Sequence, residues 1–97
     1  MLVINVTYYV KKGQRDKFLS EIRAHGIDAA SKAEKGCLAY DYYFSPDNED
    51  ILFLNEIWES EEDLKAHAEA PHFAKVQELK AVYTDNVELV KFSAEKL

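Results

Sequence analysis

Three histidines and one tryptophan are the side chains of this sequence best suited to chemistry. His67 is the best candidate for a general base, because imidazole titrates near neutral pH and can take up a proton and return it. It follows Leu64 by one helical turn, toward the apolar side of the helix predicted there. The alternative is a half-exposed histidine on the helix surface, and the sequence does not decide between the two.

The other two histidines have simpler interpretations. His72 follows Pro71 in the first turn of a predicted helix, where the positive helix end favours a neutral imidazole, and a capping or surface role suits it best. His25 falls near the apolar stripe of an earlier helix and is expected to pack there. His67 and His72 are five residues apart, with Pro71 between them. Two metal ligands on one face of a helix are usually four residues apart, so no metal site is predicted.

Residues on the predicted strands are the candidates for contacting a flat ligand. Trp58 most simply fills the core, although in a pocket its ring could stack on an aromatic substrate. Glu56 is costly to bury without a partner, so we expect it to meet a cation or water, or to accept a proton. Tyrosines either line a cavity or pack the core, and they include Tyr9, Tyr40, Tyr42 and Tyr43.

Four segments rich in β-branched and aromatic residues are predicted to be the strands that position these side chains. A short polar link joins the second and third segments, which predicts an antiparallel hairpin. The four predicted strands are Leu2–Val10, Leu38–Phe44, Ile51–Trp58 and Asn86–Phe92.

Helical spacing of apolar residues predicts the remaining elements. A long helix extends over about 14–35, with Gly26 as a weak point that permits a kink. Ser60 fits the capping position of a short helix over 61–68, and Pro71 suits the first turn of a last helix. The order β-α-β-β-α-α-β around one antiparallel sheet is the ferredoxin-like arrangement of the α+β class.

Length and charge bound the kind of protein. The chain of 97 residues is long enough for one domain, over 1–97, with a loose polar tail expected at 93–97. A net charge of −6 argues against nucleic acid and against a polybasic membrane contact. No apolar run approaches the ~18–20 residues of a membrane span. The first strand leaves no room for a signal peptide, so a cytoplasmic location is expected. The single cysteine, Cys37, is expected to be a small buried apolar residue.

Both faces of the predicted sheet carry large apolar side chains. In the strand over 51–58, even- and odd-numbered positions are both mostly apolar, yet the helices of one chain cover only one face. A second copy is the simplest cover for the other face, so we expect a homodimer packed sheet on sheet. Asn5 lies on the mixed face of the first strand. If the helices cover that face, its amide either braces a neighbouring backbone or is presented to a ligand.

Three runs of residues, in this order along the chain, resemble the antibiotic biosynthesis monooxygenase family. They are Glu-Lys-Gly-Cys-Leu-Ala-Tyr at 34–40, Glu-x-Trp-x-Ser at 56–60 and His-x-x-x-Pro-His-Phe at 67–73. The likeness covers about Val3 to Phe92. It implies a dimeric α+β barrel with a pocket between sheet and helices in each subunit.

Members similar to this chain include quinol-type monooxygenases, which oxidise electron-rich phenols and hydroquinones with O2. The resemblance implies that the protein uses no metal, haem or flavin, because the substrate supplies the electrons. The expected partners are thus a small aromatic molecule and O2. Asn5, Trp58 and His67 are expected to share one cavity, with His67 and Asn5 as the catalytic candidates. The expected substrate-binding residues are Trp58, Tyr9, Glu56, His72 and Phe73.

Other activities occur on the same scaffold. Some relatives isomerise or process a phosphorylated signalling sugar derivative, whose phosphate would need cations such as Lys32, Lys35 or Lys75. A binding dimer without catalysis is a third alternative. Haem-degrading relatives pair a strand asparagine with a helix tryptophan and an axial histidine. His67 and Gln77 stand near those last two positions here, so haem degradation is not expected. The charge of the pocket distinguishes these classes, since an aromatic, neutral pocket favours the oxygenase.

Overall fold

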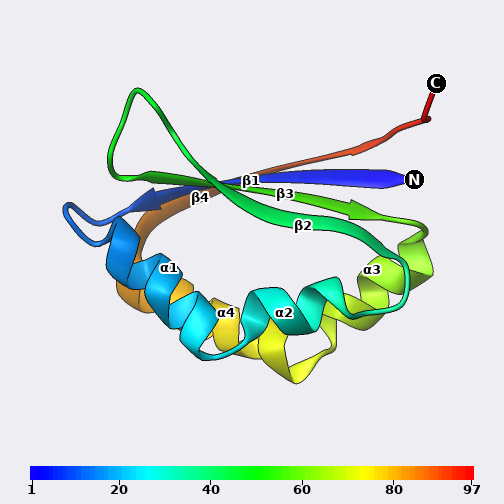
Figure 1. Cartoon of the computed structure of the whole chain (residues 1–97), viewed down its shortest axis with the longest axis horizontal. Coiled ribbons are helices and arrows are strands. Elements are labelled where there is room, and N and C mark those ends of the chain that lie inside the picture. Colours follow the sequence, from blue (N-terminus) through cyan, green and yellow to red (C-terminus); the bar gives the residue numbers. More distant parts are fainter.

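The computed structural model describes residues 1–97 as an antiparallel four-stranded sheet with four helices on one of its faces (Figure 1). The strand order in space is β2-β3-β1-β4. This is the predicted ferredoxin-like α+β fold. In chain order the elements are β1 (Leu2–Val10), α1 (Arg15–Ala24), α2 (Ile27–Lys32), β2 (Cys37–Phe44), β3 (Ile51–Trp58), α3 (Glu61–Ala68), α4 (Pro71–Tyr83) and β4 (Thr84–Ser93).

Several predicted boundaries differ from the structure: β2 begins one residue earlier than predicted, at Cys37, and β4 begins two residues earlier, at Thr84. The single helix expected over 14–35 is two helices, because Gly26 adopts a left-handed conformation with φ of 66° and breaks the helical ladder. The tail is shorter than expected, since Ser93 still belongs to β4 and the Ala94 N–H donates to the Met1 carbonyl at 2.9 Å.

The alternation of the central strand decides which side chains meet the helices. In β1 the even-numbered positions from Ile4 to Val10 are buried, and the odd-numbered ones are only half-buried. The same face of β3 carries Leu52, Leu54, Glu56 and Trp58, all buried. Register places Glu56 opposite Ile4 on one side and opposite Tyr40 on the other. The core and the carboxyl group of Glu56 therefore lie together between sheet and helices.

Contacts at the start of α3 hold the loop that follows α2 in place. Ser60 caps α3 as predicted, since its hydroxyl accepts from the Asp63 N–H at 3.2 Å and donates to the Asp63 carboxylate at 2.8 Å. Gly36 packs against Asp63 with φ of 80°, and a Cβ at this position would overlap the Asp63 side chain. The Glu59 N–H also donates to the Gly36 carbonyl at 2.8 Å. These contacts set Glu34, two residues earlier, close to α3.

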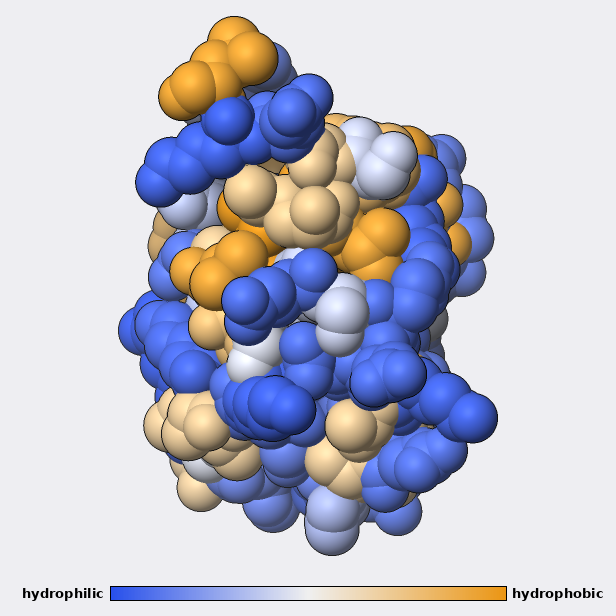
Figure 2. All heavy atoms as spheres, turned by 90° about the vertical axis from the view of Figure 1, so that its right-hand side faces the viewer, coloured by the Kyte–Doolittle hydropathy of each residue, from blue (hydrophilic) through white to orange (hydrophobic).

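The face of the sheet turned away from the helices carries no covering element (Figure 1). Large apolar side chains remain exposed there, with Val90 at 58% and Phe92 at 44%. Figure 2 views the end of the molecule that holds both termini and shows apolar side chains gathered over its sheet half, beneath the C-terminal tail. Met1, Val3 and Ile57 line a hollow in this region. No helix is long and apolar enough to cross a membrane.

Candidate active site

A small cavity of about 70 Å³ lies between the sheet and the helices. His67, Glu56 and Tyr40 form its buried end, and the exposed side chains of Gln77 and Leu89 form its rim. Its other lining residues are Val6, Tyr8, Phe73, Val76 and Lys80. Larger depressions of up to about 480 Å³ lie on the outer surface, but none contains a histidine or Trp58. The cavity is therefore the place where the candidate chemical groups meet.

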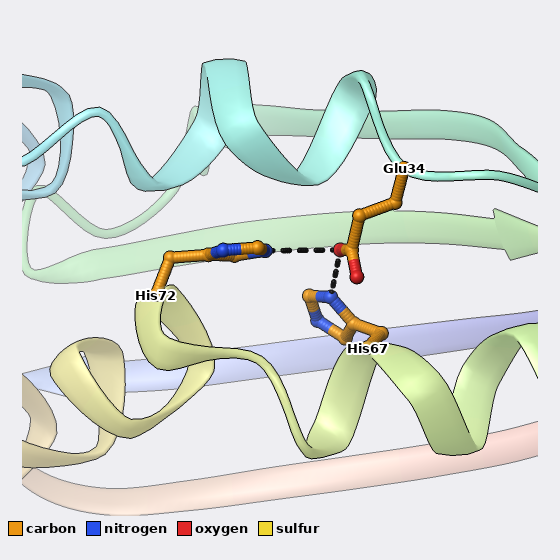
Figure 3. A group of neighbouring side chains, drawn as sticks. All are labelled: Glu34, His67 and His72. Carbon is orange, nitrogen blue, oxygen red and sulfur yellow. Dashed lines mark hydrogen bonds and ion pairs between the residues drawn. The ribbon is translucent and has the colours of Figure 1, made fainter.

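A chain of polar contacts crosses the buried end of this cavity. The Trp58 indole N–H donates to Glu56 Oε1 at 3.0 Å, and His67 Nε2 lies 3.8 Å from the same oxygen. On its other side, His67 Nδ1 donates to Glu34 Oε2. His72 Nε2 also donates to Glu34 Oε2, at 3.0 Å (Figure 3). One imidazole thus stands between two carboxylates, and a second imidazole holds the outer carboxylate.

Hydrogen-bonding roles follow from these contacts. A carboxylate only accepts, so His67 must carry its proton on Nδ1 to bond Glu34. Its Nε2 then carries a lone pair on the side that faces Glu56, whose Oε1 lies 3.8 Å away. Nε2 can take up a proton from a ligand in the cavity and return it, so His67 and the neighbouring Glu56 are arranged as a general acid–base pair.

Packing holds the His67 ring in place. The side chain is only 3% exposed, which excludes the helix-surface alternative. Its ring centroid lies 4.6 Å from Trp58, 5.4 Å from Phe73 and 5.7 Å from Tyr40. The three rings come from β3, α4 and β2, so four elements fix the orientation of one imidazole. A base that is held in this way keeps Nε2 directed at the cavity.

Burial sets the charge states around the cavity. It raises the pKa of Glu56, against the opposing effects of the Trp58 hydrogen bond and of the charges of His67 and Lys80. Burial lowers the pKa of Lys80, and the Glu56 charge opposes that shift. The pKa of Tyr40 rises to about 12, again chiefly by burial, and that of Tyr8 rises well above 10. The cavity tyrosines therefore remain neutral at physiological pH.

The structure brings five of the seven predicted site residues together. Glu56, His67 and Phe73 line the cavity, while Trp58 and His72 lie one layer behind it, against Glu56 and Glu34 respectively. The simple capping or surface role of His72 is replaced by its hydrogen bond to Glu34.

Asn5 and Tyr9 lie elsewhere. Both occupy odd-numbered positions of β1 and point to the open face of the sheet, opposite the buried Ile4 and Tyr8. Asn5 stands beside Asn55 of β3. The expectation that Asn5 shares a cavity with Trp58 and His67 is therefore wrong, because successive side chains of a strand point to opposite faces.

Two charged residues of the site, Glu34 and Lys80, were not among the predicted ones. Glu34 lies in the first of the three runs described above, but a glutamate near a helix end resembles a surface residue. Lys80 follows Phe73 and Val76 at helical spacing, which places it on the cavity side of α4. That spacing was the available signal for Lys80. Only the three-dimensional fold reveals the place of Glu34.

The remaining charged candidates lie outside the cavity. His25 is exposed, 3.6 Å from Glu21, and is not packed in the core as expected. Lys32 pairs with Asp41 at 3.5 Å, and Lys75 pairs with Glu78 at 3.2 Å. Neither these lysines nor Lys35 line the cavity. The three lysines that could have bound the phosphate of a sugar derivative thus lie outside the cavity.

Fold and site together define a small ferredoxin-like domain with a buried acid–base cavity. Residues 1–79 match the model of the antibiotic biosynthesis monooxygenase family, and the chain belongs to this family. No curated protein sequence matches the chain.

Solved structures share the fold over nearly the full length. A Bacteroides thetaiotaomicron protein of unknown function, named as a possible oxidoreductase, is 30% identical, with 94% of each chain covered and a TM-score of 0.83. The Pseudomonas aeruginosa protein PA3566 is 24% identical, covering 98% of this chain and 94% of its own, with a TM-score of 0.86. Mycobacterium tuberculosis Rv0793 is 21% identical, covering 99% and 96%, with a TM-score of 0.87. The last two likenesses support the fold alone.

Proposed function

We propose that this protein is a monooxygenase that uses O2 to oxidise a small single-ring phenol or hydroquinone. Membership of the family supports an oxygenase, and the cavity supports this class of substrate. The observation that carries the proposal is the Glu34–His67–Glu56 chain, which ends in a cavity walled by aromatic rings. An acid–base pair beside aromatic surface suits a substrate that must lose a phenolic proton.

The substrate ring lies between the sheet side chain of Tyr8 and the helix side chain of Phe73. At about 70 Å³ the cavity is smaller than the roughly 300–1,000 Å³ of a typical ligand site. Binding therefore requires the rim side chains of Gln77 and Leu89 to move, and both are exposed and free to do so. A closed cavity also shields reactive intermediates from water.

The phenolic proton passes to Nε2 of His67. Glu34 fixes the imidazole through Nδ1 and stabilises the imidazolium that forms, as a carboxylate does in other acid–base groupings. The ammonium of Lys80 stands at the same cavity and stabilises the phenolate. This anion is electron-rich enough to reduce O2. One oxygen atom enters the ring and the other leaves as water, so a hydroquinone and O2 give a hydroxyquinone and water without an outside reductant.

Charge also disfavours a phosphorylated substrate. A phosphate dianion in this cavity would meet one lysine, Lys80, and the carboxyl group of Glu56. An anionic neighbour repels the dianion in a site of low dielectric. A neutral phenol that ionises only on transfer of its proton avoids this cost.

We also infer that two copies pack through their open sheet faces. The exposed side chains of Val90 and Phe92 on β4 support this, together with Tyr43 and Phe53, whose rings lie 6.5 Å apart on the same face. A monomer would leave this apolar surface in water. Sedimentation at micromolar concentration is expected to give a dimer of the 11.2 kDa chain. A monomer alone at that concentration would contradict the inference.

The proposed reaction is tested by oxygen uptake over a panel of hydroquinones and catechols, using protein treated with a chelator. Uptake above the autoxidation rate is expected for the natural chain and is expected to fall at least about 100-fold in His67→Asn, the usual effect of removing a general base. His25→Asn is the matched control, because His25 also neighbours a glutamate but lies on the surface. Equal uptake by the natural chain and His67→Asn would contradict the proposal.

A further inference from the structure

We propose that Glu34, His67 and His72 form a binding site for a divalent transition-metal ion of the zinc type. One ligand atom from each residue lies within 4.8 Å of the other two. The three side chains point toward one another from the loop after α2, from α3 and from the first turn of α4 (Figure 3). Two imidazole nitrogens and one carboxylate oxygen are the donor set that zinc, cobalt and ferrous iron accept.

The geometry needs only a small adjustment to hold an ion. The Glu34 oxygen now accepts from both imidazoles, so the two N–H protons occupy the directions that an ion would take. An ion replaces those protons when the Glu34 carboxylate moves outward to ligand distances of roughly 2.0–2.2 Å. The Glu34 and His72 side chains are 18% and 17% exposed, which gives the ion a path of entry. Three protein ligands leave a fourth tetrahedral position for water.

The surroundings of the cluster fit a metal ion as well. A metal-binding histidine usually donates its other ring N–H to a carboxylate, which fixes its tautomer. His67 Nε2 lies 3.8 Å from Glu56 Oε1, so Glu56 stands where that second carboxylate is needed. The charges of Glu34 and Glu56 together offset the two positive charges of the ion.

The sequence predicted no metal site because His67 and His72 lack the i, i+4 spacing of paired ligands on one helix. The structure places them on α3 and α4, with ring centroids 5.7 Å apart. The third ligand comes from a residue 33 positions before His67.

Metal binding has a consequence for the proposed oxygenase, and this consequence rests on the proposed function. An ion on Nδ1 leaves the His67 proton on Nε2, where it is directed at Glu56. The imidazole then has no free lone pair for the phenolic proton. We therefore expect zinc to inhibit oxygen uptake, whereas binding itself does not depend on that reaction.

Binding is measured by titrating chelator-treated protein with Zn²⁺ in a calorimeter and with Co²⁺ by visible absorbance, which reports a four-coordinate ion. One ion per chain is expected. Glu34→Gln and His72→Asn are expected to weaken binding at least about tenfold, and His25→Asn is expected to bind as the natural chain does. Thermal melts show which variants are folded, and His72, being partly exposed, tolerates substitution better than His67.

The outcomes separate the two proposals. No Zn²⁺ binding below about 1 mM, or equal affinity in Glu34→Gln, His72→Asn and the natural chain, would overturn the metal site. Binding that is lost in these variants supports the site even if no substrate is ever oxidised. Binding at this cluster that leaves an established oxygen uptake unchanged would overturn the role of His67 as proton acceptor, but not the metal site.

Discussion

Replacing Trp58 by phenylalanine should destabilise the protein through one particular hydrogen bond. Trp58 is fully buried, and its indole N–H donates to Glu56 Oε1 at 3.0 Å. His67 lies 3.8 Å from the same oxygen, too far for a hydrogen bond. Phenylalanine keeps most of the ring but leaves the carboxyl group without its donor.

The expected loss has two parts. A hydrogen bond to a charged group contributes about 1.5–3 kcal/mol. The space left by the smaller ring costs about 1 kcal/mol more, as in other large-to-small core substitutions. The total of roughly 2.5–4 kcal/mol is a large share of the about 5–15 kcal/mol that stabilises a typical domain. A double-mutant cycle of Trp58→Phe and Glu56→Met separates the free energy of the hydrogen bond from the cost of the space that the smaller ring leaves.

Urea unfolding at one fixed protein concentration measures these free energies. Far-UV circular dichroism is the suitable signal, because the variant lacks the only tryptophan of the chain. The cycle is expected to give a coupling free energy of about 1.5–3 kcal/mol between Trp58 and Glu56. A coupling below about 0.5 kcal/mol would refute the reasoning, since the two substitutions would then act independently.

Two further predictions concern the loop that carries Glu34 and the strand that follows it. Gly36→Ala should lower the unfolding free energy by about 1–2 kcal/mol or more, because φ of 80° is costly for alanine and its Cβ would overlap Asp63. Chemical denaturation measures this, and an unchanged midpoint would contradict it. Burial is the main cause that raises the pKa of the Cys37 thiol to about 11. At pH 8 Cys37 should therefore react with a disulfide reagent at roughly one hundredth of the rate of free cysteine and gain about tenfold per pH unit up to that pKa. Equal rates in the folded and the urea-unfolded chain would show that the fold does not protect the thiol.

Local patterns were enough to predict the fold. The capping residue Ser60 and the helix-starting Pro71 predicted the bounds of α3 and the start of α4, because both act through their own backbone neighbourhood. The break at Gly26 was foreseen only as a weak point. Whether glycine bends or ends a helix depends on its φ, and here the left-handed φ of 66° ends α1 and starts α2.

The site was only partly predictable, for two physical reasons. Asn5 was assigned to the cavity although the wholly apolar even-numbered positions of β1, such as Ile4 and Val6, are the ones that the helices cover. Its assignment depended on an analogy with relatives that overrode the alternation. The role of Glu34 depends on contacts with residues 33 and 38 positions away, His67 and His72, and no local spacing reports a contact at that distance along the chain.

The central claim is that one atom of O2 enters the substrate with the help of His67. The most direct test supplies ¹⁸O2 to the protein and its best phenol or hydroquinone, followed by mass spectrometry of the product, which is reduced at once so that its oxygens do not exchange with water. We predict one ¹⁸O atom per product molecule from the natural chain and from His25→Asn, and none above background from His67→Asn. A product without ¹⁸O, formed with release of hydrogen peroxide, would contradict the account, because it would show that the protein removes electrons from the substrate without inserting oxygen.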